Sequence, residues 1–384
     1  MTAVLYKIAF ITEQSPANKH SWSGTNHYVF EILKKKGHDV TALGPLTPRF
    51  LQIVFGILNQ ISLRLFKTRF DYRHSTVYSK AFGRLFTKKL KSIDHDIVVV
   101  CGGSEYAAYI KTSKPLFLIV DRVIAGTINY HSILSGLWKF SEEQSIHTDK
   151  TAMHKARAVF FSSPWAAEHA KKYYNLKSGQ SVILPFGANL DSIVSRDLAL
   201  KQKDFDECKL LLVGTYWKNK GADIAFNALK ILLQKGVNVS LTIVGCIPPE
   251  PIQHEKLTIL PFIDKNTSTG QDELAKLFLS HHLFILPTRF DCTPIVFCES
   301  SSFGVPILTS DTGGVRGHIK EGINGFTIPY EDKGDLFAEK IESIIKSPDD
   351  YTKLCISARN LYEQELNWEH WEKEFTSNVK RLIE

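Results

Sequence analysis

Short apolar runs alternate with stretches of helical spacing along the first half of the chain. Residues 25–36 show the helical spacing most clearly, with Tyr28, Val29, Ile32 and Leu33 on one face and Gly37 directly after as a stop signal. The apolar runs predict buried strands at Leu5–Ile11, Asp39–Leu43, Ile97–Cys101, Leu116–Val120, Ala158–Phe161 and Val182–Pro185. Strands separated by helices favour right-handed crossovers and a parallel sheet.

The same alternation starts again after a polar stretch at 191–208, which reads as a linker. Helices are expected over Ala222–Lys235 and Asp272–Ser280, and a helical tail from about residue 335 to the end. Further strands are predicted at Lys209–Val213, Val239–Val244, Leu257–Leu260, Leu283–Leu286, Val305–Thr309 and Gly325–Ile328. We therefore expect two doubly wound α/β domains, 1–190 and 209–360, with ligands at the carboxyl ends of the strands.

Residues 49–91 break this rhythm, because they are helical in pattern, basic, and rich in Phe, Leu and Ile. Two interpretations fit the pattern. A cationic amphipathic surface would contact a membrane at its cytoplasmic face. Alternatively, the segment is two ordinary helices whose charges are solvated.

Composition narrows the class of protein. The 384 residues are 43% hydrophobic and 23% charged, which are values of a globular protein. The net charge of +7 fits phosphate-bearing ligands or an anionic membrane surface, although many ordinary proteins carry as much. No run reaches the roughly 20 apolar residues of a membrane span. The start, MTAVLYKIAFIT, reads as a first strand and not as a signal peptide, and six scattered cysteines without a CxxC pair favour reduced thiols. We expect a cytoplasmic protein with no nucleic-acid partner.

The segment from Phe290 to Gly304 carries the most specific chemistry. Asp291 and Glu299 lie eight positions apart across a predicted strand-to-helix turn, and Pro294 suits a first helical position. The N–H groups of Thr293, Ile295 and Val296 would then point out of the helix and form an anion site. The pattern predicts a site for a sugar nucleotide.

Three other loops follow predicted strands and could serve the same ligand. Ser23-Gly24-Thr25 places a small residue, a glycine and a hydroxyl at a helix start, although an ordinary helix cap would look the same. Gly214 allows a sharp turn, and Lys220 lies at a helix start, where the helix dipole disfavours a cation unless an anion intervenes. Ile263 could form an apolar floor for a planar base, or belong to a plain connection.

The order of these signals is more specific than any one of them. From Gly214 to Gly325 the chain reads strand–G-x5-KG–helix, strand–VG, strand–PF, then helix–strand–P, an acidic residue, x7-Glu, GVP and D-x-GG. This order strongly resembles the donor-binding half of the family 4 (group 1) glycosyltransferases, which are retaining enzymes of the GT-B fold. The resemblance is dense in the second half and loose in the first.

The resemblance implies a nucleotide-diphospho-sugar donor and roles for individual residues. Glu299 would grip the nucleotide ribose, and Lys220 would neutralise the diphosphate. Ser23, Gly24 and Thr25 would contact the diphosphate or the acceptor. The donor sugar would be held by Asp291, Cys292, Thr293, Pro294 and Ile295. The last helix, 361–384, would pack back on the first domain.

The chain departs from the family pattern at two loops. Asp291 replaces the usual glutamate, and Cys292-Thr293-Pro294 replaces the usual glycines, which removes one backbone donor. Thr215 stands where an arginine is common, and Lys218 could supply the missing charge. Donor-sugar preference is therefore expected to be set at 291–294.

In the first half, family relatives place a polar residue at a strand end near the reacting carbon. Asp121, after the strand Leu116–Val120, is the candidate for orienting the acceptor, although a strand-end aspartate can simply cap a turn. Glu105 would also face the ligand and could bind hydroxyls. Asp121, Lys220 and Asp291 are thus the candidate catalytic residues.

The expected function is retaining transfer of a sugar to an acceptor hydroxyl, in polysaccharide or glycoconjugate synthesis. The acceptor would be a glycan, a lipid-linked glycan or a small molecule, and no metal or other cofactor is expected. Two alternatives stay open: a nucleotide-sugar 2-epimerase of the same architecture, and an inactive subunit that only binds sugar nucleotides.

Overall fold

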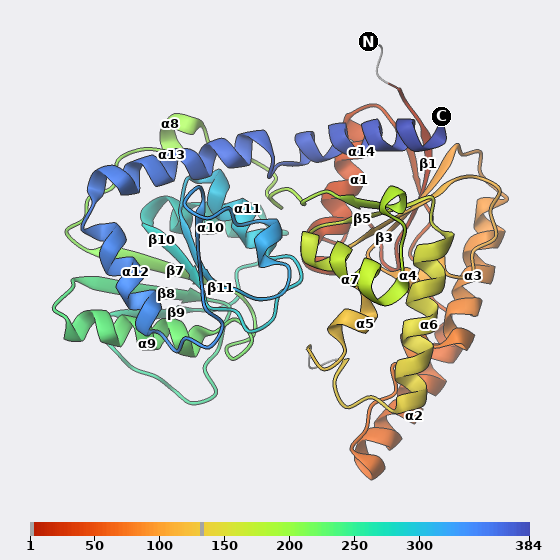
Figure 1. Ribbon diagram of the computed structural model, residues 1–384, viewed down its shortest axis with the longest axis horizontal. Helices are drawn as coiled ribbons and strands as arrows, with labels where there is room; N and C mark the ends of the chain where they lie inside the picture. Colours follow the sequence, from red (N-terminus) through yellow and green to blue (C-terminus); the bar gives the residue numbers. More distant parts are fainter. Residues whose placement is uncertain (1–3, 131–133) are drawn as a thin grey trace. The chain divides into compact units, whose positions relative to one another are not determined.

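The computed structural model describes residues 4–130 and 134–384. The chain divides into two compact units: unit 1 comprises Met1–Pro185 and Trp371–Glu384, and unit 2 comprises Phe186–His370. Within the described ranges, each unit is built on one six-stranded sheet with helices packed on its faces (Figure 1). All neighbouring strands in both sheets are parallel, as the alternating pattern predicts.

The sheet of unit 1 has the strand order β2-β1-β3-β4-β5-β6. Its strands lie at β1 Lys7–Ile11, β2 Asp39–Ala42, β3 Ile97–Cys101, β4 Leu116–Val120, β5 Ala158–Phe161 and β6 Ser181–Ile183. Its α-helices are α1 Thr25–Lys35, α2 Arg49–Phe66, α3 Thr76–Leu90, α4 Ser104–Ala107, α5 Ile124–Thr127, α6 Lys139–Lys155 and α7 Pro164–Tyr174. Short 3-10 turns occupy Ser21–Gly24, Tyr72–His74 and Ser178–Gln180.

The sheet of unit 2 has the order β12-β11-β10-β7-β8-β9. Its strands lie at β7 Cys208–Val213, β8 Val239–Val244, β9 Leu257–Leu260, β10 Leu283–Leu286, β11 Ile307–Ser310 and β12 Gly325–Ile328. Its helices are α8 Arg196–Ala199, α9 Ala222–Gln234, α10 Ser268–Ser280, α11 Ile295–Ser302, α12 Asp335–Ile345 and α13 Pro348–Gln364, with a 3-10 turn at Val315–Gly317. All the strands predicted from the apolar runs are present in the two sheets.

The predicted helical tail consists of three separate helices. Pro348 occupies the first turn of α13, where its missing N–H costs nothing, and a second break precedes α14, Trp368–Ile383. From Trp371 onward α14 belongs to unit 1, where the Phe375 ring lies 4.9 Å from Phe160 and 6.4 Å from Phe117. From Trp371 onward the last helix therefore completes the core of unit 1, whereas residues 361–370, also expected to pack there, belong to unit 2.

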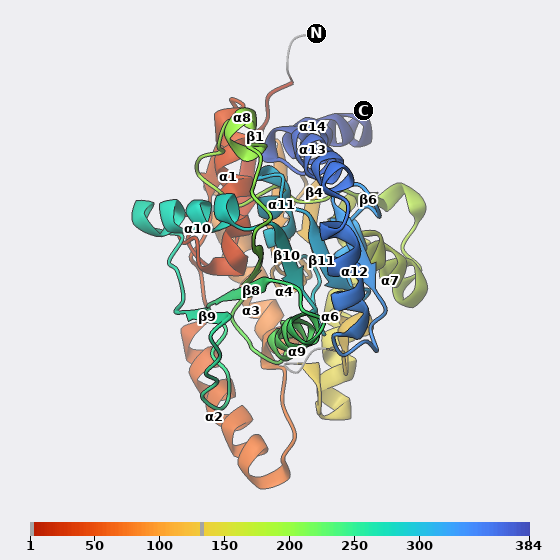
Figure 2. The same cartoon turned by 90° about the vertical axis from the view of Figure 1, so that its left-hand side faces the viewer.

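Helix α2 differs from the other helices of unit 1 in its position. It projects from the body of the unit in two perpendicular views (Figures 1 and 2). Within 4–130 and 134–384, no helix has the length and apolarity to cross a membrane.

Candidate functional site

The strand order places a switch point in the middle of the unit 2 sheet. The chain runs outward from β7 to β8 and β9, then returns to add β10 on the other side of β7. The loops that follow β7 and β10 therefore diverge at the carboxyl ends of two adjacent strands. Doubly wound sheets bind ligands in such a crevice. Lys220 lies in the first of these loops and Asp291 in the second.

Lys220 and Asp291 form an ion pair across this switch point. The Lys220 Nζ lies 2.5 Å from Asp291 Oδ2, and the side chains are 23% and 9% exposed. The other carboxylate oxygen, Oδ1, accepts the backbone N–H of Thr293 at 3.2 Å. The anion that the position of Lys220 predicts at the start of α9 is thus, in this structure, the carboxylate of Asp291.

Glycines bring the lysine to this position. Gly221 has φ +69°, and a Cβ on it would lie 1.9 Å from the carbonyl oxygen of Pro287, so only glycine lets the loop pass this close to the end of β10. A Cβ on Gly214 would lie 2.7 Å from the Lys220 Cγ. The predicted role of Gly214 in the turn therefore includes leaving room for the lysine stem.

A second set of contacts fixes the same loop to the segment before Asp291. The carbonyl of Asn219 accepts the backbone N–H of Arg289 at 2.8 Å and the Thr288 hydroxyl at 3.0 Å. Arg289 also donates through both terminal nitrogens to Asp223, at 2.7 and 2.9 Å. Burial alone would raise the pKa of Asp223, but the hydrogen bonds from Arg289 and Lys218 outweigh it and lower the pKa.

The sequence analysis did not name Arg289 as a site residue. Its position directly before the acidic motif was the one signal that could have identified it. Lys218, expected to replace a missing arginine at the donor, instead donates to Asp223 at 3.0 Å. Its side chain is exposed, so the charge lies at the surface of the site.

Glu299 pairs with a lysine that the sequence analysis also missed. Its side chain is buried on α11, and Oε1 accepts a hydrogen bond from Lys265 Nζ at 2.5 Å. Lys265 follows the Phe262-Ile263-Asp264 turn after β9. Its position directly after that turn was the only signal that Lys265 could belong to the site. The sequence alone does not indicate that the loop after β9 lies close to α11.

The start of α11 corrects the predicted anion site. Pro294 is the residue before the helix and not its first residue. The N–H of Ile295 donates to the Thr293 carbonyl at 2.9 Å, and the N–H of Thr293 donates to Asp291. Two of the three N–H groups expected to be bare are thus engaged inside the loop, because the backbone folds back on itself before the helix begins.

Three predicted binding residues are largely buried. Cys292 and Ile295 lie in the interior of unit 2, and Ile263 belongs to its hydrophobic core with 9% of its surface exposed. The Ile263 side chain can offer a base only a small area, because most of it is buried in this core. Cys292 and Ile295 can meet a ligand mainly through their backbone.

In unit 1 the loop after β1, which carries the predicted residues Ser23 and Gly24, has left-handed backbone angles. Trp22, Ser23 and Gly24 all have positive φ, at 50°, 56° and 91°, and Gly24 caps α1. The indole N–H of Trp22 donates to Asp121 Oδ2 at 3.0 Å. Thr25 is buried at the start of α1. The structure thus joins two predicted sites of this unit, the loop after β1 and the end of β4, through Trp22.

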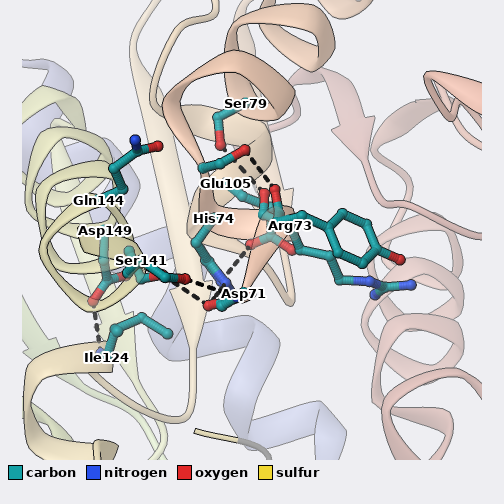
Figure 3. A network of polar contacts seen from close by, with 12 residues as sticks. Asp71, Arg73, His74, Ser79, Glu105, Ile124, Ser141, Gln144 and Asp149 are labelled. Atoms are coloured by element: carbon teal, nitrogen blue, oxygen red, sulfur yellow. Dashed lines mark hydrogen bonds and ion pairs between the residues drawn. The ribbon is translucent and has the colours of Figure 1, made fainter. Parts of the chain in front are cut away.

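Glu105 lies in a buried ionic network (Figure 3). His74 lies between two carboxylates, with Nδ1 2.8 Å from Asp71 Oδ2 and Nε2 3.3 Å from Glu105 Oε2. Burial would lower the pKa of His74, but both carboxylates raise it well above its usual value. Burial would raise the pKa of Asp71, yet His74 lowers it to about 2. Glu105 is therefore a structural partner of an imidazolium and has little surface for a sugar hydroxyl.

Among the described side chains, no three His, Cys, Asp or Glu residues gather in a group that could hold a metal ion.

Comparison with known proteins relates part of unit 2 to a family of glycosyltransferases. Residues 207–347 match the model of the glycosyl transferases group 1. Over 178 residues the chain is 25% identical to the capsular polysaccharide biosynthesis glycosyltransferase CapM of Staphylococcus aureus, an alignment that covers 44% of this chain and 46% of CapM. The match thus spans about half the length of that relative.

Solved structures match over nearly the whole chain. Sucrose-phosphate synthase from Thermosynechococcus elongatus aligns with a TM-score of 0.68 and 16% identity, over 98% of each chain. Anabaena HepE, solved in complex with UDP-glucose, aligns with a TM-score of 0.63 and 14% identity, over 98% of this chain and 100% of its own. The chain therefore has the GT-B fold, and residues 207–347 match the model of the glycosyl transferases group 1.

Proposed function

We propose that this protein is a retaining glycosyltransferase that uses a nucleotide-diphospho-sugar donor. One observation carries the proposal: two lysines pair with two buried carboxylates inside the segment that matches the group 1 model, Lys220–Asp291 at the switch point and Lys265–Glu299 between the loop after β9 and α11. Cations in such a crevice suit a diphosphate. Carboxylates suit hydroxyl groups, because an ionised carboxylate only accepts hydrogen bonds.

On binding, the donor would replace some of the contacts that these side chains make with one another. The ammonium group of Lys220 has three donors, so it can keep Asp291 and also contact the diphosphate. Glu299 would accept hydrogen bonds from the ribose hydroxyls in place of Lys265, which lies at a half-exposed position and can move aside. Asp291 orients Lys220 and turns its Oδ1 edge, shared with the Thr293 N–H, toward a sugar hydroxyl.

The transfer step needs charge stabilisation more than a dedicated base. The bond from the anomeric carbon to the phosphate oxygen breaks, and a bond to the acceptor oxygen forms on the same face. The leaving phosphate oxygen takes the acceptor proton, so the products are the glycosylated acceptor and a nucleoside diphosphate. Lys220 would stabilise the negative charge that develops on the diphosphate. Asp121, held by Trp22, would orient the acceptor.

The relatives indicate which substrates to test first. CapM is named for capsular polysaccharide synthesis and HepE was solved with UDP-glucose, which favours a glycan or lipid-linked acceptor and makes UDP-glucose the first donor to try. A small-molecule acceptor is the further class to include, since sucrose-phosphate synthase shares the fold. The proposed location is cytoplasmic, where nucleotide-sugars are available.

The test is release of nucleoside diphosphate from a panel of donors, with and without acceptors, followed by NMR of the anomeric configuration of the product. Acceptor-dependent release with retention is the expected result. Isomerisation of the donor without acceptor would instead identify an epimerase. Donor binding with no release for any acceptor would identify a binding subunit.

A further inference from the structure

Helix α2 has polar residues on its inward face and a stripe of large apolar residues on its outward face. Its inward stripe is Leu51, Phe55, Asn59 and Ser62, spaced at one helical turn. The Asn59 Oδ1 accepts the backbone N–H of Phe70 at 2.8 Å, and the Ser62 hydroxyl donates to the carbonyl of Thr68 at 2.7 Å. The helix is thus fastened to unit 1 partly by polar contacts, and its apolar face is left uncovered.

The outward stripe follows the same helical period. It consists of large apolar side chains that are between 46% and 77% exposed, namely Phe50, Ile53, Ile57, Ile61 and Leu65. Leu58 and Phe66 widen the stripe on one side. A contiguous apolar surface of this kind on a helix marks a contact site, because single exposed apolar residues are ordinary but a continuous stripe is not.

Aromatic side chains extend the surface at the end of α2. The ring of Phe66 lies 5.4 Å from that of Trp138 in an edge-to-face arrangement, and both are exposed, as is Phe140. The indole N–H of Trp138 donates to Ser62 at 2.7 Å. Tryptophan with a satisfied N–H and an exposed ring is typical of side chains at the level of lipid headgroups.

The segment that carries the stripe is strongly basic. Residues 49–91 carry ten arginines and lysines against one acidic residue, so their net charge is +9, while the whole chain has +7. The one acidic residue is Asp71, whose carboxylate is paired with His74 inside the protein. The exposed cations of α2 and its end are Arg49, Arg64 and Lys67. A groove along α2, lined by Ile53, Ile57 and Arg64 among others, combines apolar walls with one of these cations.

We propose that the outward stripe of α2 docks unit 1 on an anionic lipid bilayer. The 18-residue helix, about 27 Å long, would lie in the plane of the headgroups, with Phe50, Ile57 and Leu65 among the acyl chains. Its arginines and lysines would contact lipid phosphates. The net positive charge of residues 49–91 favours a bilayer over a second copy of this chain, because two such segments would repel each other. This proposal is independent of the glycosyltransferase proposal.

Vesicle co-sedimentation tests this docking. The full-length protein is mixed with vesicles of phosphatidylglycerol in phosphatidylcholine, and with phosphatidylcholine alone. We expect binding to the anionic vesicles that weakens as salt is added. The triple variant Ile57→Ser/Ile61→Ser/Leu65→Ser should lose at least tenfold in partitioning. The control, Ile323→Ser/Leu336→Ser/Ile356→Ser, removes three exposed apolar residues of unit 2 and should bind like wild type.

A variant without two of the cations measures the electrostatic contribution to vesicle binding separately from the apolar contribution. Arg64→Gln/Lys67→Gln should lower partitioning roughly thirtyfold, since each cation near an anionic surface contributes about 1 kcal/mol. Lys171→Gln/Lys177→Gln on and beside α7 is the control. Circular dichroism checks that each variant is folded. Equal binding of wild type and the triple variant would overturn the proposal. So would a wild-type dimer that ignores vesicles and becomes monomeric in the triple variant.

Discussion

The ammonium nitrogen of Lys220 and a carboxylate oxygen of Asp291 lie 2.5 Å apart, although 71 positions separate the residues in sequence. They follow β7 and β10, which are adjacent only because the chain returns to the centre of the sheet after β9. The topology therefore assembles the charge pair that the proposed donor site needs.

Replacing Lys220 by methionine tests its two roles separately. The change leaves Asp291, which is 9% exposed, without its cation, so the free energy of unfolding should fall by about 1–3 kcal/mol. Stabilisation by a nucleoside diphosphate should also disappear from thermal unfolding curves. Lys276→Met, at an exposed position of α10, is the control. A Lys220→Met protein that keeps the ligand-induced shift would remove Lys220 from the site.

Two glycines with similar backbone angles separate strain from steric overlap. Gly221→Ala and Gly236→Ala both place a side chain at positive φ, at +69° and +77°, which should cost about 1–2 kcal/mol. At Gly236 the new methyl group meets nothing within 4 Å, whereas at Gly221 it overlaps the Pro287 carbonyl oxygen. Chemical denaturation should therefore show a clearly larger loss for Gly221→Ala. Equal losses would mean that the two loops do not approach as closely as described.

The His74 network predicts a pH-dependent stability. The pKa of His74 is raised in the folded protein, so its contribution is fully present below the unfolded-state pKa of about 6.5 and is lost as the pH rises through the folded-state pKa. His74→Gln leaves Asp71 and Glu105 buried without a cation. The loss of unfolding free energy should be about 3–5 kcal/mol at mildly acidic pH.

The same difference should shrink at alkaline pH, because wild-type His74 is then neutral too. Denaturation of wild type and His74→Gln across pH checks this, with His147→Gln at an exposed position of α6 as control. A difference that stays constant with pH would mean that His74 is neutral in the folded state.

Asp121 and Trp22 offer a test of the acceptor side. Trp22→Phe keeps an aromatic ring but removes the N–H that donates to Asp121. If Asp121 orients the acceptor, Trp22→Phe should raise the KM for the acceptor severalfold and leave donor binding unchanged, and Asp121→Asn should have the larger effect. An unchanged acceptor KM in both variants would leave Asp121 as a turn cap.

The strands were predictable because each is a short apolar run bounded by turn residues, and Ile97–Cys101, Leu116–Val120 and Leu283–Leu286 begin and end as expected. The exact ends of some strands were less predictable. The first strand begins at Lys7 and not at Leu5, because Leu5 lies outside the sheet and is exposed. Side-chain partners between distant segments carry no local signal.

The pair of Lys265 with Glu299 illustrates this limit. Each residue was visible as a charge near a strand end or a motif, but only the fold brings the loop after β9 to α11. The start of α11 was misjudged for a related reason. Proline favours the first helical turn in general. Here the backbone N–H groups of Thr293 and Ile295 form hydrogen bonds inside the loop, so the helix begins one residue later, at Ile295.

Donor binding to Glu299→Gln, measured by isothermal titration calorimetry with UDP-glucose and other nucleotide-sugars, tests the central claim most directly. The change keeps the shape of the buried side chain and removes its charge. Glu273→Gln, exposed on α10, is the matched control. The account predicts that one donor binds wild type and the control equally, and binds Glu299→Gln roughly tenfold to a hundredfold more weakly. Equal affinity for Glu299→Gln and wild type would contradict it.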